Sequence, residues 1–311
     1  MFATVLRRAT TFAAAGLLTA PSLSVLAITG GVSVDEVMDA RAGSRYTEQQ
    51  VAFAHAVSAV TVALFNAAGD GKGGSLCTAT IVHPRVVLTA AHCVLNGQEV
   101  SRRIIVVFER GASRRQALEV MVHPAILKMI RSRSAKPQSP KIQQSRKAVD
   151  AAFVSADLAL VLLHRPAPEA HEVVAPVARG FRDSRASTKL IAGYGIVDGH
   201  QSLERLSLNF AELRGNSKLD EGAFSGESEI IMESRYRDGA RVNVCSGDSG
   251  GPIFVLDRAT SRLRQLAVTS AGDLHCREVA IFASIDSQRA VLREMFDELM
   301  EGEVGAEENP F

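Results

Sequence analysis

The fold of this chain is constrained most by a series of short apolar, β-branched runs, each bounded by Gly, Pro, Ser or Asp. Such runs are typical of the strands of sandwiches and barrels. With 311 residues, 46% of them hydrophobic, the chain can bury the core of one large or two small domains. We therefore predict an all-β protein. The runs are Ile81–Leu88, Ile104–Phe108, Leu158–Leu163, Leu190–Gly195, Ile253–Leu256, Leu266–Ser270 and Val279–Ile285.

Two apolar segments depart from this pattern. Val51–Phe65 is a continuous apolar stretch, which does not distinguish a helix from a strand. Near the end of the chain, apolar residues at helical spacing follow a candidate cap at Asp286 or Ser287, and we expect a helix that closes the core. Its apolar positions are Leu292, Met295, Phe296 and Leu299.

Residues 1–27 have the layout of a secretory signal peptide: Arg7 and Arg8, the apolar run Phe12–Leu18, then small residues up to Ala27. A membrane anchor is the alternative, but this run is shorter than the ~20 residues that cross a bilayer. The arginines also permit twin-arginine export, although the ordinary route is simpler. We expect a secreted or periplasmic protein whose four cysteines form disulfides, with three pairings open.

The charge distribution argues against nucleic-acid binding. The formal net charge is +1, without the basic field that a phosphate backbone requires.

After the signal segment no run is apolar enough to span a membrane, and no two histidines are spaced as zinc ligands. We therefore expect no membrane association, no metal and no cofactor. We interpret the basic insertion, residues 128–147, as an exposed flexible loop, with a docking site or a site of chain cleavage as the alternative. Residues 300–311 form an acidic tail, and we expect the acidic stretch Asp297–Glu308 to fray.

A candidate nucleophile, Ser249, lies in the segment Gly247–Pro252 (GDSGGP). The glycines can adopt positive φ, so the serine can sit on a tight turn whose main-chain amides point at a reacting oxygen. A serine hydroxyl is protonated at neutral pH and needs a base. His92 can accept its proton, provided that a buried acceptor fixes the imidazole tautomer. Asp157 opens an apolar strand and fits that role, because a buried aspartate without a partner would be costly.

These motifs resemble those of the trypsin/chymotrypsin family of serine proteases, from about Cys77 to Ile285. The order His92, Asp157, Ser249 is the family's order and differs from those of subtilisins and α/β-hydrolases. The resemblance implies two six-stranded antiparallel β-barrels, with the histidine and aspartate in the first and the serine in the second. We expect the first barrel and an N-terminal extension within residues 28–175, the second barrel and the helix within 176–299, and a secreted, bacterial member of the family.

The same resemblance implies how the cysteines pair. It joins Cys77 to Cys93, which pins the strand that carries the histidine, and Cys245 to Cys276, which ties the serine loop to the opposite wall of the specificity pocket. Free buried thiols are the alternative. Each bridge is expected to contribute about 2 to 4 kcal/mol.

Further roles follow from the family pattern. The amides of Gly247 and Ser249 would form the oxyanion hole. Ser270 would lie beside the triad aspartate, and Gly272 would pair with extended substrate. The turn Gly193-Tyr194-Gly195 resembles the family's entry into the second barrel, with tyrosine in place of the usual tryptophan.

Asp248 would pair with a new α-amino group at a mature N-terminus, as in the family. Ile28 begins the sequence Ile-Thr-Gly-Gly directly after the signal segment, so signal cleavage alone would create that terminus. The stretch from Ile28 to Cys77 is longer than the family's. Either an insertion lies within it, or a second cut after Arg41 or Arg45 creates a different terminus.

Specificity is expected to differ from that of an Arg- or Lys-selective enzyme. Asn243 stands where an aspartate at the pocket base would select basic side chains, and Val244 follows in place of a small hydroxyl residue. Ala280 replaces a glycine, although that alignment can slip by one residue. We predict a preference for uncharged, small to medium side chains, because a guanidinium would lose water without gaining a counter-charge. Asp273 at the pocket mouth, or Glu278, would favour basic substrates instead.

The resemblance implies a serine endopeptidase that acts on polypeptides through an acyl-enzyme, with proteinaceous inhibitors as further partners. A non-catalytic binding module is the alternative from another class. Such relatives usually lack the serine or histidine, and both are present here. An esterase with the same triad is a second alternative.

Overall fold

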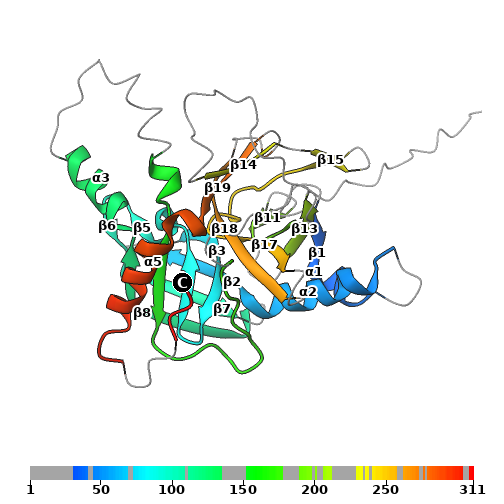
Figure 1. Ribbon diagram of the computed structural model, residues 1–311, viewed down its shortest axis with the longest axis horizontal. Helices are drawn as coiled ribbons and strands as arrows, with labels where there is room; N and C mark the ends of the chain where they lie inside the picture. Colours follow the sequence, from blue (N-terminus) through cyan, green and yellow to red (C-terminus); the bar gives the residue numbers. More distant parts are fainter. Residues whose placement is uncertain are drawn as a thin grey trace, which may run out of the picture.

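The computed structural model describes residues 31–40, 45–68, 73–108, 111–134, 152–177, 189–197, 200–201, 206–211, 229–233, 235–237, 240–257, 262–272, 276, 279–303 and 308–311. Most of its elements are strands, arranged in two bodies, with α1 and α2 beside one and α3 and α5 beside the other (Figure 1). The elements are β1 (Val32–Ser33), α1 (Val34–Met38), α2 (Glu48–Val60), β2 (Thr61–Ala67), β3 (Gly74–His83), β4 (Val86–Thr89), η1 (Ala91–Val94), β5 (Leu95–Asn96), β6 (Glu99–Val100), β7 (Ile104–Phe108), β8 (Ser113–Val122), α3 (Pro124–Ser134), β9 (Ala159–Leu163), β10 (Lys189–Gly193), β11 (Ile196–Val197), β12 (His200–Gln201), β13 (Ser207–Ala211), β14 (Glu229–Glu233), β15 (Arg235–Arg237), β16 (Ala240–Val242), β17 (Pro252–Asp257), β18 (Arg262–Gly272), β19 (Val279–Ser284) and α5 (Ile285–Leu299).

The first body is a closed barrel of six antiparallel strands in the order β2-β3-β4-β9-β8-β7. Its interior is filled by buried aliphatic side chains such as Leu64, Leu88 and Leu160. The run Ile81–Leu88 forms two strands, because Pro84 and Arg85 make a turn between β3 and β4. Proline lacks the N–H that a central strand needs, so the run breaks there.

The second body is an antiparallel sheet with the order β1-β13-β10-β17-β18-β19-β14 among the described strands. The all-β fold with a closed six-stranded barrel and a C-terminal helix is therefore confirmed. The sheet also contains a strand that the sequence did not predict. In β1, Val32 pairs with Leu208 of β13, so the N-terminal extension is part of this sheet.

The ambiguous stretch Val51–Phe65 contains both a helix and a strand. Helix α2 begins with a capping box, in which Thr47 and Gln50 bond each other's main-chain amides, and it ends at Val60. Thr61 then starts β2, where it pairs with Thr80 of β3. On the second body, Val34 and Val37 of α1 are buried in one cluster with Val57 of α2.

The C-terminal helix α5 begins two or three residues earlier than expected. Ser284 is the N-cap, with an extended backbone, so the prediction of a cap at Asp286 or Ser287 is wrong. The buried face of α5 packs against the core of the first barrel. No helix among the described residues is both long and apolar enough to cross a membrane.

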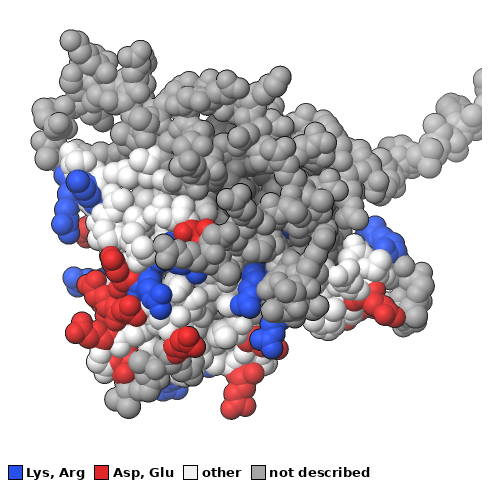
Figure 2. All heavy atoms as spheres, viewed as in Figure 1, with Lys and Arg blue, Asp and Glu red and all other residues white. Residues whose placement is uncertain are grey.

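The end of the chain is docked rather than frayed. Phe311 is buried and its ring packs edge-on against Phe296 of α5. Asn309 donates to the main-chain oxygen of Arg293, and Glu303 forms an ion pair with Arg85 of the first barrel. Acidic side chains gather at the lower left of Figure 2, in the region where Figure 1 places the end of α5. Apolar and hydrogen-bond contacts hold the described part of this tail against the barrel.

The basic insertion begins as a helix, which corrects its interpretation as a loop. Residues 128–134 belong to α3, and the rest of the insertion up to residue 147 lies outside the described residues. Ile126 is fully buried, and Ile130 packs against the first core. These apolar contacts one turn apart stabilise the helix, while Lys128 remains exposed on the other face.

Candidate active site

The structure brings His92 and Asp157 together at one end of the first barrel. His92 lies in η1, directly after β4, and Asp157 lies just before β9. The carboxylate is fully buried, and its Oδ1 accepts the His92 main-chain N–H at 2.9 Å. Its Oδ2 lies 2.7 Å from His92 Nδ1 and accepts the Ser270 hydroxyl at 2.6 Å. Asp157 therefore orients the imidazole and leaves Nε2 as the outward nitrogen.

Burial of His92 disfavours the imidazolium, but the charge of Asp157 and its hydrogen bond outweigh that effect and raise the pKa of His92 above its ordinary value. The side chain keeps 34% of its surface exposed. It can therefore exchange a proton with a group outside the barrel.

Ser249 comes from the second body but is bonded to both. Its carbonyl accepts the main-chain N–H of Thr78 in β3 at 2.8 Å, and the next amide, that of Gly250, donates to Thr269 in β18. A Cβ at Gly250 would lie 2.1 Å from Thr89 Oγ1 and 3.1 Å from the Ala90 nitrogen. The serine loop thus lies against the segment that leads to His92.

The serine hydroxyl makes no hydrogen bond with the described residues. Catalytic hydrogen bonds are often long before a substrate binds. Among the described residues, the contact between the serine loop and the His92 segment is therefore made by Gly250 against Thr89 and Ala90, without a direct hydrogen bond between Ser249 and His92.

The amides of Gly247 and Ser249 are free within the described part of the chain, since neither donates a hydrogen bond there. Gly247 has φ +97°, which other residues rarely adopt, and a Cβ would lie 2.8 Å from the Gly195 Cα. Glycine is therefore required here. Two unpaired amides on one tight loop can stabilise a developing oxyanion.

Asp248 is fully buried behind this loop. Its carboxylate accepts the amides of Gly195 and Cys245, and Gly193 and Gly195 leave room for it, because a Cβ on either would overlap the carboxyl group. Desolvation raises the pKa of Asp248 to about 8, although both amide bonds act in the opposite direction. Ile28, its predicted partner, lies outside the described residues.

The predicted pocket residues lie close together in the second body. Asn243 is fully buried and its Oδ1 accepts the amide of Val244. Val244 and Ala280 belong to one buried cluster, and Gly272 pairs with Ala280 across β18 and β19. Asp273 and Glu278, the alternative acids, lie outside the described residues.

Both predicted disulfides are present. Cys77 bonds Cys93, and Cys245 bonds Cys276. Three potential metal-ligand atoms, on Cys77, His92 and Cys93, lie within 4.8 Å of one another. Among the described residues this is the one cluster of three such side chains. Both sulfurs belong to the disulfide, so they offer no thiolate to a metal.

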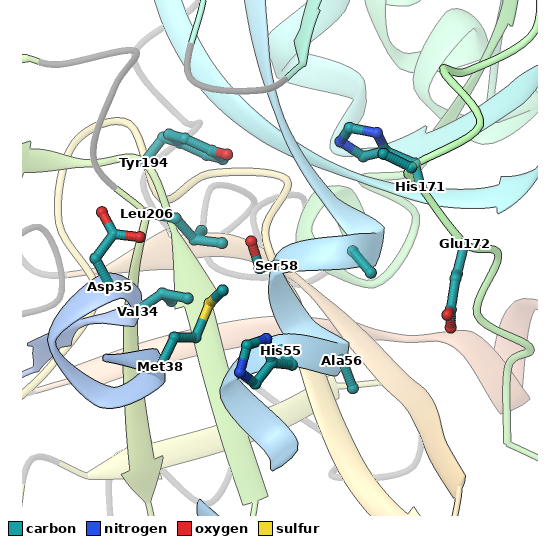
Figure 3. Close-up of a pocket in the computed structure, with 12 residues that line it drawn as sticks. Val34, Asp35, Met38, His55, Ala56, Ser58, His171, Glu172, Tyr194 and Leu206 are labelled. Carbon is teal, nitrogen blue, oxygen red and sulfur yellow. The ribbon is translucent and has the colours of Figure 1, made fainter. Parts of the chain in front are cut away.

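A cavity of about 540 Å³ lies elsewhere, between α1, α2, residues 170–172 and the second body (Figure 3). Asp35 of α1 and His55 of α2 line it, and His171 and Glu172 line it from a segment that is bonded to α2 through the Glu172 amide. Tyr194 of the Gly-Tyr-Gly turn also contributes to its wall. None of the predicted catalytic, oxyanion or specificity residues lines this cavity.

Comparison with known proteins assigns the family. The model of the family described as Trypsin matches residues 49–291. The chain belongs to the trypsin family. It is 26% identical over 185 residues to Kallikrein 1-related peptidase b1 of Mus musculus, covering 58% of this chain and 65% of the relative. It is also 26% identical over 203 residues to Venom serine protease 34 of Apis mellifera, covering 64% of this chain and 46% of that protein.

The chain thus spans just under two thirds of the length of the mouse relative. Both relatives are animal proteins and give no support to the expected bacterial origin.

Thr78 is a buried residue of the site that the sequence of this trypsin-family chain did not indicate. Thr78 bonds the serine loop through its main chain and its side chain. The only sequence signal is its place next to Cys77, and that does not indicate a contact with the second body.

Proposed function

We propose that this protein is a secreted serine endopeptidase that hydrolyses peptide bonds through an acyl-enzyme. His92 acts as general base, Asp157 orients and stabilises its imidazolium, and Ser249 attacks the substrate carbonyl. The observation that supports this most is the buried Asp157, which bonds both the ring and the main chain of His92. The free amides of Gly247 and Ser249 support the oxyanion role.

In this mechanism, Nε2 of His92 takes the proton of the Ser249 hydroxyl as the oxygen attacks the carbonyl carbon. The two amides stabilise the negative oxygen of the tetrahedral intermediate. The imidazolium then gives its proton to the leaving amine, and a water molecule repeats the sequence to release the acyl group. The raised pKa of His92 makes the imidazole a stronger base for the first step.

A fluorophosphonate probe tests this proposal directly, because it reacts only with an activated serine. The wild-type protein should be labelled and Ser249→Ala should not. Absence of labelling would favour the binding module. Labelling with hydrolysis of simple esters but of no peptide or protein would favour the esterase.

For activation, we propose that the α-amino group of Ile28 pairs with Asp248. The buried carboxylate and its elevated pKa support this, because a charged partner is needed to keep it ionised at neutral pH. The buried Val34 and Val37 favour retention of β1 and α1 over a second cut that would discard them. Amino-terminal sequencing of active protein should give Ile-Thr-Gly-Gly, and a start at Ala42 or Tyr46 would instead indicate a propeptide.

For specificity, we propose that the pocket accepts uncharged, small to medium side chains. The neutral Asn243 at its predicted base supports this, as do the apolar Val244 and Ala280 beside it. Cleavage of a peptide library should favour such residues. Strong and exclusive cleavage after Arg or Lys would contradict the proposal and would implicate Asp273 or Glu278. Polypeptide substrates and proteinaceous inhibitors are the partners that follow from this function.

A further inference from the structure

Thr78 is a fully buried residue of β3 that none of the roles above uses. Its hydroxyl donates to the carbonyl of Gly247 at 2.9 Å and accepts the main-chain N–H of Tyr194 at 2.9 Å. Its own amide donates to Ser249, and its carbonyl accepts the Thr89 hydroxyl. One residue of the first barrel therefore bonds two loops of the second body.

The two side-chain bonds hold these loops in register. Among the described residues, the Thr78 hydroxyl is the group that bonds the Gly247 carbonyl. This bond fixes the peptide between Gly247 and Asp248. Behind that peptide, the Asp248 carboxylate accepts the amide of Gly195, the residue after Tyr194. The hydroxyl thus closes a ring of bonds around the loop that presents the Gly247 and Ser249 amides.

We propose that Thr78 is a positioning residue for the oxyanion hole, through the bridge that its hydroxyl makes between Gly247 and Tyr194. The inference rests on the proposed function, because it assigns Thr78 a task within that reaction. Thr78 does not contact the substrate. Its hydroxyl orients the peptide after Gly247 so that the two free amides converge on the carbonyl oxygen.

Thr78→Val is the direct test, because valine has nearly the same shape, keeps both main-chain bonds and removes only the hydroxyl. We expect kcat to fall about tenfold or somewhat more, less than the roughly 100- to 1,000-fold loss caused by removing an oxyanion-hole donor. KM should stay within about twofold, because the lost effect concerns the transition state. A peptide aldehyde, which forms a tetrahedral adduct with an active serine, should bind more weakly by the same factor as kcat/KM.

Two further variants separate positioning from packing. Thr78→Ser restores the hydroxyl and should recover most of kcat. Thr80→Val is the matched control, because Thr80 lies two residues along β3, is equally buried, and its hydroxyl has no partner among the described residues. It should leave kcat and aldehyde binding unchanged. If Thr78→Val does not fold, Thr78→Ala serves the same test without placing a methyl group against the carbonyl.

Several outcomes would overturn the inference. These are a folded Thr78→Val with wild-type kcat, a loss confined to KM, or a Thr78→Ser variant as impaired as Thr78→Val. If the wild type labels with the fluorophosphonate and Thr78→Val labels at the same rate, the inference fails and the proposed function stands. If the wild type itself does not react, the proposed function fails, and this inference fails with it.

Discussion

At the scale of single residues, the candidate site depends on the hydrogen bonds that the carboxylate of Asp157 accepts. Asp157 accepts bonds from the His92 amide, the His92 ring and the Ser270 hydroxyl, and it has no exposure to solvent. Three donors compensate the loss of water around the charge. They also hold the ring in one orientation, since a carboxylate bonded at Nδ1 fixes the tautomer.

The triad should act as a unit. His92→Ala and Ser249→Ala should each lower turnover of a peptide substrate by several orders of magnitude, because each removes the same proton-coupled attack. The double variant should be little worse than either single variant. Steady-state kinetics on the three purified proteins provides the measurement, and multiplicative losses would mean that the two residues act independently.

Activity should fall on the acid side with a midpoint above 6.5, the ordinary pKa of histidine, because the pKa of His92 is raised and only the neutral ring can accept the serine proton. In Asp157→Asn the carboxylate charge is gone and burial of the ring remains. The midpoint of the residual activity should then move below that of the wild type. A profile of kcat/KM against pH for both proteins tests this, and identical midpoints would argue against the assignment.

At the scale of elements, the sequence predicts best where local pattern and burial agree. The β-branched runs form strands, and the His92 and Asp157 motifs, each next to one end of a recognisable strand, lie within hydrogen-bond distance of each other. One boundary and one contact were not predictable from pattern alone. The helix α2 and the strand β2 are both apolar, and their junction at Thr61 is set by pairing with β3. Thr78 was missed because its side-chain partners lie 169 and 116 residues away along the chain.

The docked end of the chain gives a prediction at this scale. Phe311→Ala should lower the free energy of unfolding by about 2 kcal/mol, the typical worth of burying a phenylalanine side chain. Phe311→Leu should lose less, because most of the contact with Phe296 is retained. Urea unfolding in a Ser249→Ala background, which prevents self-digestion, makes the comparison. Equal stability of all three proteins would show that the Phe311 ring contributes nothing to stability.

At the scale of the whole molecule, the buried Asp248 links the state of the N-terminus to pH. Without a cationic partner its folded-state pKa is about 8, far above the ordinary 3.8. The folded protein then binds this proton more tightly than the unfolded chain does. The contribution of this carboxyl to the free energy of unfolding is therefore greatest below about pH 4 and is lost as pH rises toward about 8.

Protein with an extra residue before Ile28 should therefore lose a few kcal/mol of unfolding free energy between about pH 5 and 8. Protein that begins at Ile28 should not show this loss, because the paired carboxylate is already ionised. Chemical unfolding of both forms, each carrying Ser249→Ala, measures the difference. Asp248→Asn with the blocked terminus should remove the pH dependence, and its persistence there would assign the effect to another group.

The first and last elements of the described chain each pack on the body formed mainly by the other half of the chain. Strand β1 joins the second sheet before β2 begins the first barrel, and α5 returns from the second sheet to cover the first core. Each body is thus completed by a segment that the other half of the chain supplies. Expressed separately, the two halves would each expose an unpaired sheet edge or an uncovered core face. We therefore expect the two halves, when mixed, to associate by fragment complementation.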